Sequence, residues 1–433
     1  MPGAAVILGR RGARPGHSVT TAHFAAAYPF LGQGGIRAPG VYMGIDAYGG
    51  AFAYDPWELY SRRLVRSPNM LFVGGIGYAK STGIKTYLYR QRLFARDIWV
   101  IDIKGEYRPL GEALGYPPLE LRPGGEVCLN PLTRRGGRET QLSLLRSVVQ
   151  AALARDLSPE EEAGLRVALD LVNEEAGKGE PTLPMVVDVL LNPREAMVAG
   201  VHASGAEEFA ASNRESALAL QRLCEGDLHG MFDGPTSPGL DLGAPVVILD
   251  LSAVRDSAAL GVIMTCAAAW QQALLLERKR ESERTGVPMK KTIVVVEEVW
   301  RVAGILAVAE WLQSNFKLCR SLGIQCLLSL HKLSDFSASG AAGSRELKII
   351  QGLVADCGCV VLYQQSPDQR PILRGDLALS ETQTELTMSL RVGEFLIVMG
   401  REAELVQQRM SALERGFTFT DEQMGVIAPA VAE

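Results

Sequence analysis

The stretch "PNMLFVGGIGYAKSTGIKTYLYRQ" (residues 68–91) decides the fold, because it reads as a buried strand, a glycine-rich turn and an amphipathic helix in succession. Gly74, Lys80 and Ser81 fall on the template G-x-x-x-x-G-K-[ST], and Ala79 stands in place of its second glycine. A chance glycine-rich turn is the alternative. The strand before the turn and the helix after it favour a loop that binds phosphate.

The residue types of this loop suit a nucleotide triphosphate. Small residues let backbone N–H groups wrap the phosphates, and the helix that follows adds the positive end of its dipole. Lys80 is expected to reach the β- and γ-phosphates, and the Ser81 hydroxyl to ligate Mg²⁺. Gly74, Gly75, Gly77, Ala79 and Thr82 complete the set predicted to line the nucleotide. The sequence therefore predicts binding of ATP with Mg²⁺.

Ala79 is a departure with a definite cost. If its position requires a positive φ, the Cβ of alanine costs about 1–2 kcal/mol relative to glycine. The methyl group also comes close to the path of the phosphates. Alanine is the smallest such change, so weakened binding is expected rather than abolished binding.

A second motif, "KKTIVVVEEVW" (290–300), runs from an apolar strand into the carboxylates Glu297 and Glu298. In a Walker B strand the first carboxylate holds Mg²⁺ through water and the second polarises the attacking water. Glu297 stands where aspartate is usual, and an acidic cap at a strand end is the alternative. Asp102, Lys104 and Glu106 follow another predicted strand end.

His331 follows a third strand end, in "LSLHKLSDF" (328–336), where a polar residue could sense the γ-phosphate. A lone histidine is otherwise a packed or surface residue. Ligands of open α/β sheets bind at the carboxyl ends of the strands, so the placement of these groups is coherent.

Short runs of β-branched and apolar residues recur along the chain, as in strands covered on both faces. They are residues 70–75, 97–102, 245–251, 292–298, 324–330, 358–363 and 394–399. Helical stretches separate most of them. This alternation predicts an α/β fold: a P-loop NTPase core with a mostly parallel, doubly wound sheet. A short hairpin around Gly49-Gly50, followed by a helix near Asp55-Pro56, is expected before the core.

The strand rhythm breaks between Asn130 and about Gly243, where helical signals dominate. "SPEEEAGLRVALDLVNEE" (158–175) has a serine N-cap, proline at N1 and three glutamates in its first turn, and "ESALALQRLCEG" (215–226) is amphipathic. The predicted organisation is a partly ordered arm (1–40), the first part of the core (41–132), an inserted helical subdomain (133–243), and the second part of the core with a C-terminal tail (244–433).

Composition narrows the class of protein. The net charge of −5 excludes a general electrostatic footprint for nucleic acid, so any DNA contact must be local. The seven cysteines form no C-x-x-C pair and no zinc spacing, which predicts a reducing, cytoplasmic setting without zinc. No signal peptide is recognised. "AALGVIMTCAAAWQQALLL" (258–276) is 19 residues without charge; burial against a sheet is favoured over a membrane span.

With these motifs in place, the chain resembles a known family. "WVIDIKGEYRPLGEALG", "CLNPL", "VVVEEVW" and "LHKLSDF" follow the phosphate loop in the order seen in TraC-like type IV secretion and conjugation motor ATPases of the HerA–FtsK superfamily, with actinobacterial members most similar. The resemblance covers roughly residues 40–420. It implies a RecA-like core with an inserted helical region, often a hexamer. Its partners would be membrane-embedded secretion or conjugation components at the cytoplasmic face, with DNA contact open.

The resemblance also implies site roles. Lys80 and Ser81 correspond to the loop residues, Glu297 and Glu298 to the Walker B pair, and His331 to a position where many relatives have glutamine. The family takes an arginine from a neighbouring subunit, for which the candidates are Arg320, Arg374 and Arg401.

The expected function is an ATP-hydrolysing motor that powers translocation or assembly. Its Ala79, Glu297 and His331 departures allow slow hydrolysis. A catalytically weak scaffold subunit of the same machine is one alternative. A HerA-like cytoplasmic DNA translocase is the other.

Overall fold

The computed structural model describes residues 39–134, 137–153, 155–194, 205–226, 228–238, 240–255, 259–302, 306–334, 345–400 and 402–418. The predicted N-terminal arm lies almost wholly outside these residues. The chain divides into two compact units. Unit 1 combines Met1–Arg96, Gln325–Ala338 and Gly352–Glu433, and unit 2 combines Asp97–Ile324 and Ser339–Gln351. Each unit is described by itself.

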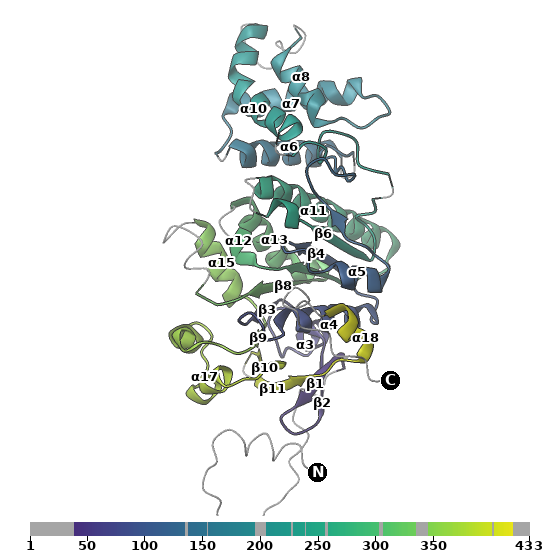
Figure 1. The fold of residues 1–433 in the computed structure, drawn as a ribbon. Coiled ribbons are helices and arrows are strands. Elements are labelled where there is room, and N and C mark those ends of the chain that lie inside the picture. The colour runs from purple at the N-terminus through teal and green to yellow at the C-terminus, as the bar shows by residue number, and fades with distance from the viewer. Residues whose placement is uncertain are drawn as a thin grey trace, which may run out of the picture. The chain divides into compact units, whose positions relative to one another are not determined.

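Unit 1 contains seven strands among its described residues, in the order β2-β1-β11-β10-β9-β3-β8. Their bounds are β1 Val41–Asp46, β2 Ala51–Tyr54, β3 Met70–Val73, β8 Ile324–Leu330, β9 Cys359–Leu362, β10 Glu394–Met399 and β11 Glu402–Gln408. β3 runs parallel to both β8 and β9, whereas the pairings of β10 and β11 with their neighbours are antiparallel. In Figure 1 the purple β1 and the yellow β11 lie side by side, so unit 1 joins the two ends of the described chain.

The helices of unit 1 follow its strands. They are α3 Pro56–Ser61, α4 Lys80–Arg92, α16 Arg370–Gly375, α17 Glu381–Met388 and α18 Ala412–Thr418. α3 begins where Asp55 accepts hydrogen bonds from the N–H groups of Trp57 and Glu58, with Pro56 at N1. The predicted hairpin and the helix after it are therefore present. α15 (Arg345–Ala355) crosses from unit 2 into unit 1.

Unit 2 contains four strands in its described residues, in the order β7-β4-β6-β5. They are β4 Asp97–Asp102, β5 Leu119–Glu120, β6 Val246–Asp250 and β7 Thr292–Val296, all paired in parallel. Every residue of β4, β6 and β7 is buried, because helices cover both faces of a parallel sheet. The helices next to these strands in the chain are α5 Arg108–Leu114, α11 Ala259–Thr285, α12 Val299–Val302 and α13 Leu306–Leu322.

The chain between β5 and β6 forms helices and, in its described residues, no strand. They are α6 Arg138–Leu153, α7 Pro159–Glu175, α8 Leu183–Leu191 and α10 Ala206–Glu225. Figure 1 shows them gathered as a bundle, and α6 packs on α11. α7 has the predicted Ser158 N-cap as a full capping box with Glu161. α10 begins nine residues before the helix predicted at 215–226, because its first half is also amphipathic.

α11 contains the apolar stretch that raised the question of a membrane span. Its segment Leu260–Thr285 is long and apolar enough to cross a bilayer, with a mean hydropathy of 1.3 over its most apolar window. About 65% of that window is buried inside the protein. The helix also continues into the charged "ERKRESER" segment, as predicted. A core helix of the α/β fold accounts for these properties.

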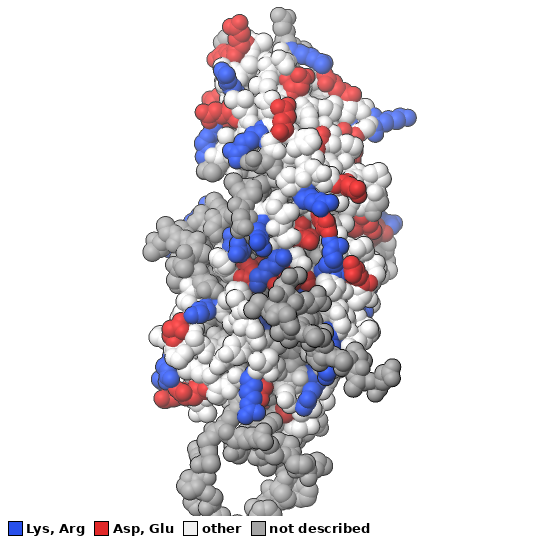
Figure 2. Space-filling model, in the orientation of Figure 1, with Lys and Arg blue, Asp and Glu red and all other residues white. Residues whose placement is uncertain are grey.

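The surface carries both signs of charge. On the face shown in Figure 2, Lys and Arg side chains intermingle with Asp and Glu and do not gather by sign. Many charged side chains of the described residues form ion pairs, such as Arg138 with Asp170 and Arg345 with Glu310. This mixed surface agrees with the net charge of −5.

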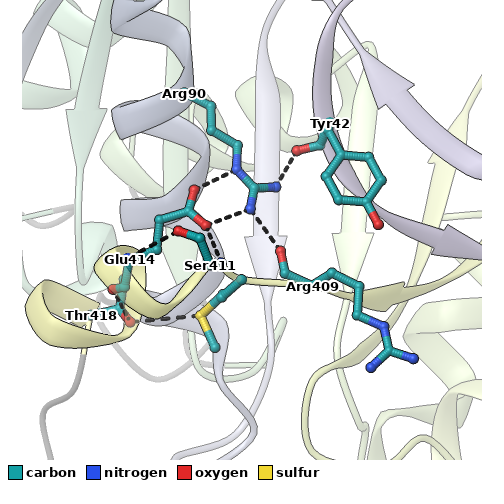
Figure 3. Close-up of polar contacts among 7 residues, drawn as sticks. Tyr42, Arg90, Arg409, Ser411, Glu414 and Thr418 are labelled. Carbon is teal, nitrogen blue, oxygen red and sulfur yellow. Dashed lines mark hydrogen bonds and ion pairs between the residues drawn. The ribbon is translucent and has the colours of Figure 1, made fainter. Parts of the chain in front are cut away.

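A buried ion pair ties the C-terminal helix of unit 1 to α4 (Figure 3). The Arg90 guanidinium donates to both carboxylate oxygens of Glu414, at 2.6 and 2.7 Å, and also to the backbone carbonyls of Tyr42 and Arg409. Burial alone would raise the pKa of Glu414, but the hydrogen bonds from Arg90 and the Ser411 N–H outweigh burial and lower it. α4 is therefore anchored to β1, to the residue after β11 and to α18 through one side chain.

Candidate functional site

The predicted phosphate loop lies in unit 1, between the end of β3 at Val73 and the start of α4 at Lys80. Ala79 is the N-cap of α4 and adopts the left-handed region, with φ 69° and ψ 24°. Gly77 has a positive φ of 83°. Ala79 makes no side-chain hydrogen bond that caps α4, so the N–H groups at the start of this helix and the positive end of its dipole suit an anion.

Lys80 is buried at the foot of this loop. Its side chain is only 5% exposed, and its Nζ donates to Ser329 Oγ of β8 at 2.7 Å. A buried ammonium group favours an anion beside it, because burial disfavours an isolated charge. Lys80 and the helix N-terminus therefore place two positive features at the same loop.

His331 lies beside the start of the loop. β3 and β8 are parallel, with Val73 opposite Leu330, and the Gly74 N–H donates to the Leu330 carbonyl at 3.2 Å. His331 is the next residue after Leu330 and is partly exposed. The structure thus brings His331 to the edge of the sheet from which the loop emerges.

The carboxylate pair lies in unit 2, immediately after β7. Glu297 and Glu298 are each only 1% exposed. The Tyr107 hydroxyl donates to Glu297 Oε1 at 2.8 Å. Burial and the adjacent charge of Glu297 hold the pKa of Tyr107 well above its usual value, so Tyr107 stays a hydrogen-bond donor at neutral pH.

Glu298 is held from two sides. Lys104 Nζ lies 2.8 Å from its Oε1, and the Trp300 indole N–H donates to its Oε2 at 2.6 Å. Burial would lower the pKa of Lys104, but the hydrogen bond and charge of Glu298 outweigh burial and raise it. Glu298 also has a φ of 51°, a conformation that costs a non-glycine residue about 1–3 kcal/mol. Strain of this kind concentrates at functional sites.

Asp102 shapes the turn that supplies these partners. Its carboxylate accepts backbone N–H groups of Lys104, Gly105 and Tyr107 at 3.1, 2.8 and 2.9 Å. Burial raises its pKa to about 6, with contributions from the charges of Glu297 and Asp250, against the hydrogen bond from Tyr107. The turn directs Lys104 and Tyr107 onto the two glutamates.

The predicted site residues thus fall into two groups. The loop residues Gly74, Gly75, Gly77, Ala79, Lys80, Ser81 and Thr82 lie in unit 1 with His331, and Glu297 and Glu298 lie in unit 2. Ser81 and Glu297, predicted together as metal ligands, belong to different units. Of the arginine candidates, Arg320 is exposed on α13 and Arg374 on α16, and Arg401 lies outside the described residues.

Sequence reasoning missed four side chains that contact these groups. They are Tyr107, Trp300, Ser329 and Tyr363. Trp300 lies two residues after Glu298 inside the quoted motif, so proximity alone was a signal for it. Tyr107, Ser329 and Tyr363 follow or occupy predicted strands and carry no spacing signal of their own.

The residues present fit Mg²⁺ with ATP. The loop offers the backbone N–H groups of its glycines and a buried lysine, and Ser81 lies in the first turn of α4. Among the described residues there is no cluster of three His, Cys, Asp or Glu side chains that would hold a metal by itself. A metal here would therefore need phosphate oxygens together with a hydroxyl, as Mg²⁺ does in nucleotide sites.

These observations define the class: the chain has an α/β P-loop NTPase fold, with parallel strands that end in a phosphate loop and a carboxylate pair. The predicted fold class is thereby confirmed. Among solved structures, VirB4 of Thermoanaerobacter pseudethanolicus is similar, with a TM-score of 0.69 and 21% identity over 87% of this chain and 98% of that chain.

The bacterial conjugative coupling protein TrwB is also similar, with a TM-score of 0.51 and 13% identity over 87% of this chain and 91% of that chain. TrwB has been solved with the ATP analogue ADPNP, at a TM-score of 0.51 and 14% identity over 81% of this chain and 87% of that chain. No family model and no curated protein matches the chain.

Proposed function

We propose that this protein is an ATP-hydrolysing motor subunit of a conjugation or type IV secretion machine. The observation that carries the proposal is the loop itself: buried Lys80 at the N-terminus of α4, in a fold similar to that of VirB4 and TrwB. TrwB complexes with ADPNP and with ADP and Mg²⁺ support the choice of nucleotide and metal.

The roles follow from the chemistry of each residue. The loop N–H groups and Lys80 would neutralise the phosphates, and Ser81 and Glu297 are the residues that would offer oxygen ligands to Mg²⁺. Glu298 would orient the attacking water and accept its proton, as the water oxygen bonds to the γ-phosphorus and the bond between that phosphorus and the ADP oxygen breaks. His331, which follows Leu330 opposite Val73, would sense the γ-phosphate. Lys104 and Trp300 fix where the Glu298 carboxylate points.

The resemblance extends the proposal to assembly and location. We propose that the chain forms a homo-oligomer, as a hexamer, in the cytoplasm. It would associate with membrane-embedded secretion or conjugation components at the inner face of the membrane. The helical region 133–243 acts as a subdomain inserted between the two parts of the core. An arginine from a neighbouring subunit, with Arg320 and Arg374 as described candidates, completes each nucleotide site.

A catalytically weak scaffold subunit is the second candidate. The observation that favours it is the ion pair that the Glu298 carboxylate already makes with Lys104, at 2.8 Å, because a carboxylate bound to a cation is less available to an attacking water.

Phosphate release by the purified chain tests the motor. We expect Mg²⁺-dependent ATP hydrolysis that falls by at least about 100-fold in Lys80→Ala and in Glu298→Gln, since each removes a group that acts in the transition state. Fluorescent nucleotide binding separates the two variants: Glu298→Gln keeps binding and Lys80→Ala loses it.

The exposed residues Lys348 and Glu310 provide matched controls, because Lys348→Ala and Glu310→Gln make the same chemical changes away from the loop and the carboxylate pair. Equal background rates in wild type and in both test variants would rule out the motor and leave the scaffold.

A further inference from the structure

The Tyr363 side chain lies next to Gly74, at the start of the phosphate loop, and next to Gly83, in the first turn of α4. It follows β9 directly, is fully buried, and its N–H donates to the Val73 carbonyl at 2.8 Å. β9 runs parallel to β3 with Leu362 opposite Val73, so Tyr363 and Gly74 leave the sheet side by side.

At two glycines of this region, Tyr363 leaves no room for a side chain. A Cβ on Gly74 would lie 2.5 Å from Tyr363 Cβ, and a Cβ on Gly83 would lie 2.0 Å from Tyr363 Oη. Gly83 belongs to the first turn of α4, where its N–H donates to the Ala79 carbonyl at 2.9 Å. One tyrosine therefore touches both ends of the loop, its base at Gly74 and its hydroxyl at Gly83.

The far end of the tyrosine is itself fixed. Its hydroxyl lies 3.2 Å from Gln408 Oε1 of β11, and its ring packs against Phe395 of β10 at 5.6 Å between centroids. The next residue, Arg409, accepts the Arg90 hydrogen bond from α4. β11 and the residue after it thus hold α4 at two points, Gln408 through Tyr363 and Arg409 through Arg90.

We propose that Tyr363 is a positioning residue for nucleotide binding, which sets the height of the first turn of α4 relative to the start of the phosphate loop. The inference rests on the proposed function, because it concerns the affinity of the same loop for nucleotide. A phosphate cradle of backbone N–H groups tolerates errors of only about 0.5 Å, so displacement of either end lowers affinity.

The contacts predict a specific pattern of rescue. The alanine Cβ of Gly83→Ala would collide with the Tyr363 hydroxyl, and Tyr363→Phe removes that hydroxyl. The atoms then nearest to the Cβ are the ring carbon Cζ and Gln408 Oε1, each at 3.2 Å. Gly74→Ala meets Tyr363 Cβ, which phenylalanine retains. Tyr363→Phe should therefore rescue Gly83→Ala and fail to rescue Gly74→Ala.

The experiment measures the affinity of methylanthraniloyl-ADP with Mg²⁺ by fluorescence titration, and the melting temperature of each variant, in the full chain. We expect Gly83→Ala to weaken binding at least about tenfold, as overpacking does, and the Gly83→Ala/Tyr363→Phe double variant to return within about threefold of wild type. Gly74→Ala/Tyr363→Phe should bind as weakly as Gly74→Ala alone.

Two matched controls isolate the contact. Gly352 is a helical glycine in α15 with no atom within 4 Å of an added Cβ, so Gly352→Ala should leave affinity unchanged. Tyr87 is a buried tyrosine of α4 whose hydroxyl donates to Gln325 at 2.7 Å, so Tyr87→Phe removes a similar hydrogen bond that involves neither Tyr363 nor Gln408.

The outcomes separate the inference from the function. Wild-type affinity in Gly83→Ala, or no recovery in the double variant, overturns the role of Tyr363 alone. If Gly83→Ala does not fold, the two double variants decide, because only the one at Gly83 should fold and bind. A wild type that binds without hydrolysis removes the motor and leaves the role of Tyr363 standing. A wild type that does not bind removes both.

Discussion

Ala79 shows how one methyl group enters the chemistry of the loop. Its φ of 69° is the positive value that the template reserves for glycine, so the cost anticipated from sequence is present. Because the strain exists without nucleotide, its relief must appear in stability. Any change in affinity must come from removal of the methyl group beside the phosphates.

Ala79→Gly is therefore expected to raise the free energy of unfolding by about 0.5–1 kcal/mol, after the entropy that glycine adds to the unfolded chain. It should also tighten nucleotide binding by about three- to tenfold. Urea unfolding and nucleotide titration measure the two effects.

Ala95 is the matched control, since it is exposed and has a φ of 57° away from the loop. Ala95→Gly should give the same gain in stability with no change in affinity. A change in affinity of equal size in both variants would contradict the role given to Ala79.

At the scale of single residues, the sequence predicted the loop and the carboxylates. It could not predict the side chains that hold them in place. Lys80 and Glu298 stand in local motifs, so spacing reveals them. Their partners Ser329 and Lys104 come from segments about 250 and 190 residues away, and only the folded sheet brings each pair together. The positive φ of Glu298 likewise has no signature in residue type.

Among the elements, α7 carries an acid-sensitive contact. The Arg155 side chain donates to both oxygens of Glu161, and the Ser158 N–H and Ser216 hydroxyl donate as well. These hydrogen bonds, that of Arg155 foremost, lower the pKa of Glu161 to about 2, against the effect of its burial.

Because this pKa lies below its unfolded value, the stabilisation is complete above the unfolded pKa of 4.5 and is lost as pH falls toward 2. Glu161→Gln should cost about 1–2 kcal/mol at pH 7, a value reduced for the exposure of Arg155, and nearly nothing near pH 2. Urea unfolding followed by circular dichroism at several pH values measures the difference.

Glu162→Gln supplies the comparison, because Glu162 lies next in the same turn, is exposed, and pairs with Arg146 at 3.5 Å. Its effect should stay within about 0.5 kcal/mol at every pH. A constant gap between wild type and Glu161→Gln from pH 7 to pH 3 would be incompatible with this assignment.

The sequence predicted the fully buried strands correctly and missed a strand that is only partly buried. The runs at 97–102 and 324–330 coincide with β4 and β8, in which every residue is buried. β11 was missed, since its "EAELVQQ" has one fully buried residue, Val406, and shows no continuous apolar run. It forms by an antiparallel turn from β10, through Gly400 at a φ of 61°. The antiparallel pairing of β10 was also beyond the sequence pattern.

For the whole molecule, the net charge favours a secretion-type motor over a HerA-like DNA translocase, which must bind DNA. A net charge of −5 and the mixed surface in Figure 2 predict weak attraction to the DNA backbone. We expect a dissociation constant for duplex DNA above about 100 µM at physiological salt, weaker than the usual range for non-specific binding. Fluorescence anisotropy at 50 and 200 mM salt measures it.

A steep loss of affinity between those salt concentrations, together with hydrolysis stimulated by DNA, would favour the HerA-like translocase. Oligomeric state is measured in the same samples by light scattering, with and without nucleotide. Hydrolysis that DNA leaves unchanged agrees with a motor whose substrate reaches it through partner proteins.

Unit 1 is built from three separate segments of the chain, so it can complete its folding only after its last segment has been synthesised. β1 pairs with β11 across more than 350 residues, and Arg90 pairs with Glu414 over a similar separation, whereas the four strands described in unit 2 lie between residues 97 and 296. The strands of unit 2 can pair while the ribosome is still extending the chain. The phosphate loop is synthesised before unit 2, whereas Tyr363, Gln408 and Glu414 are synthesised after it. Nascent chains that stall before residue 400 should therefore carry the nucleotide motif without the ability to retain nucleotide.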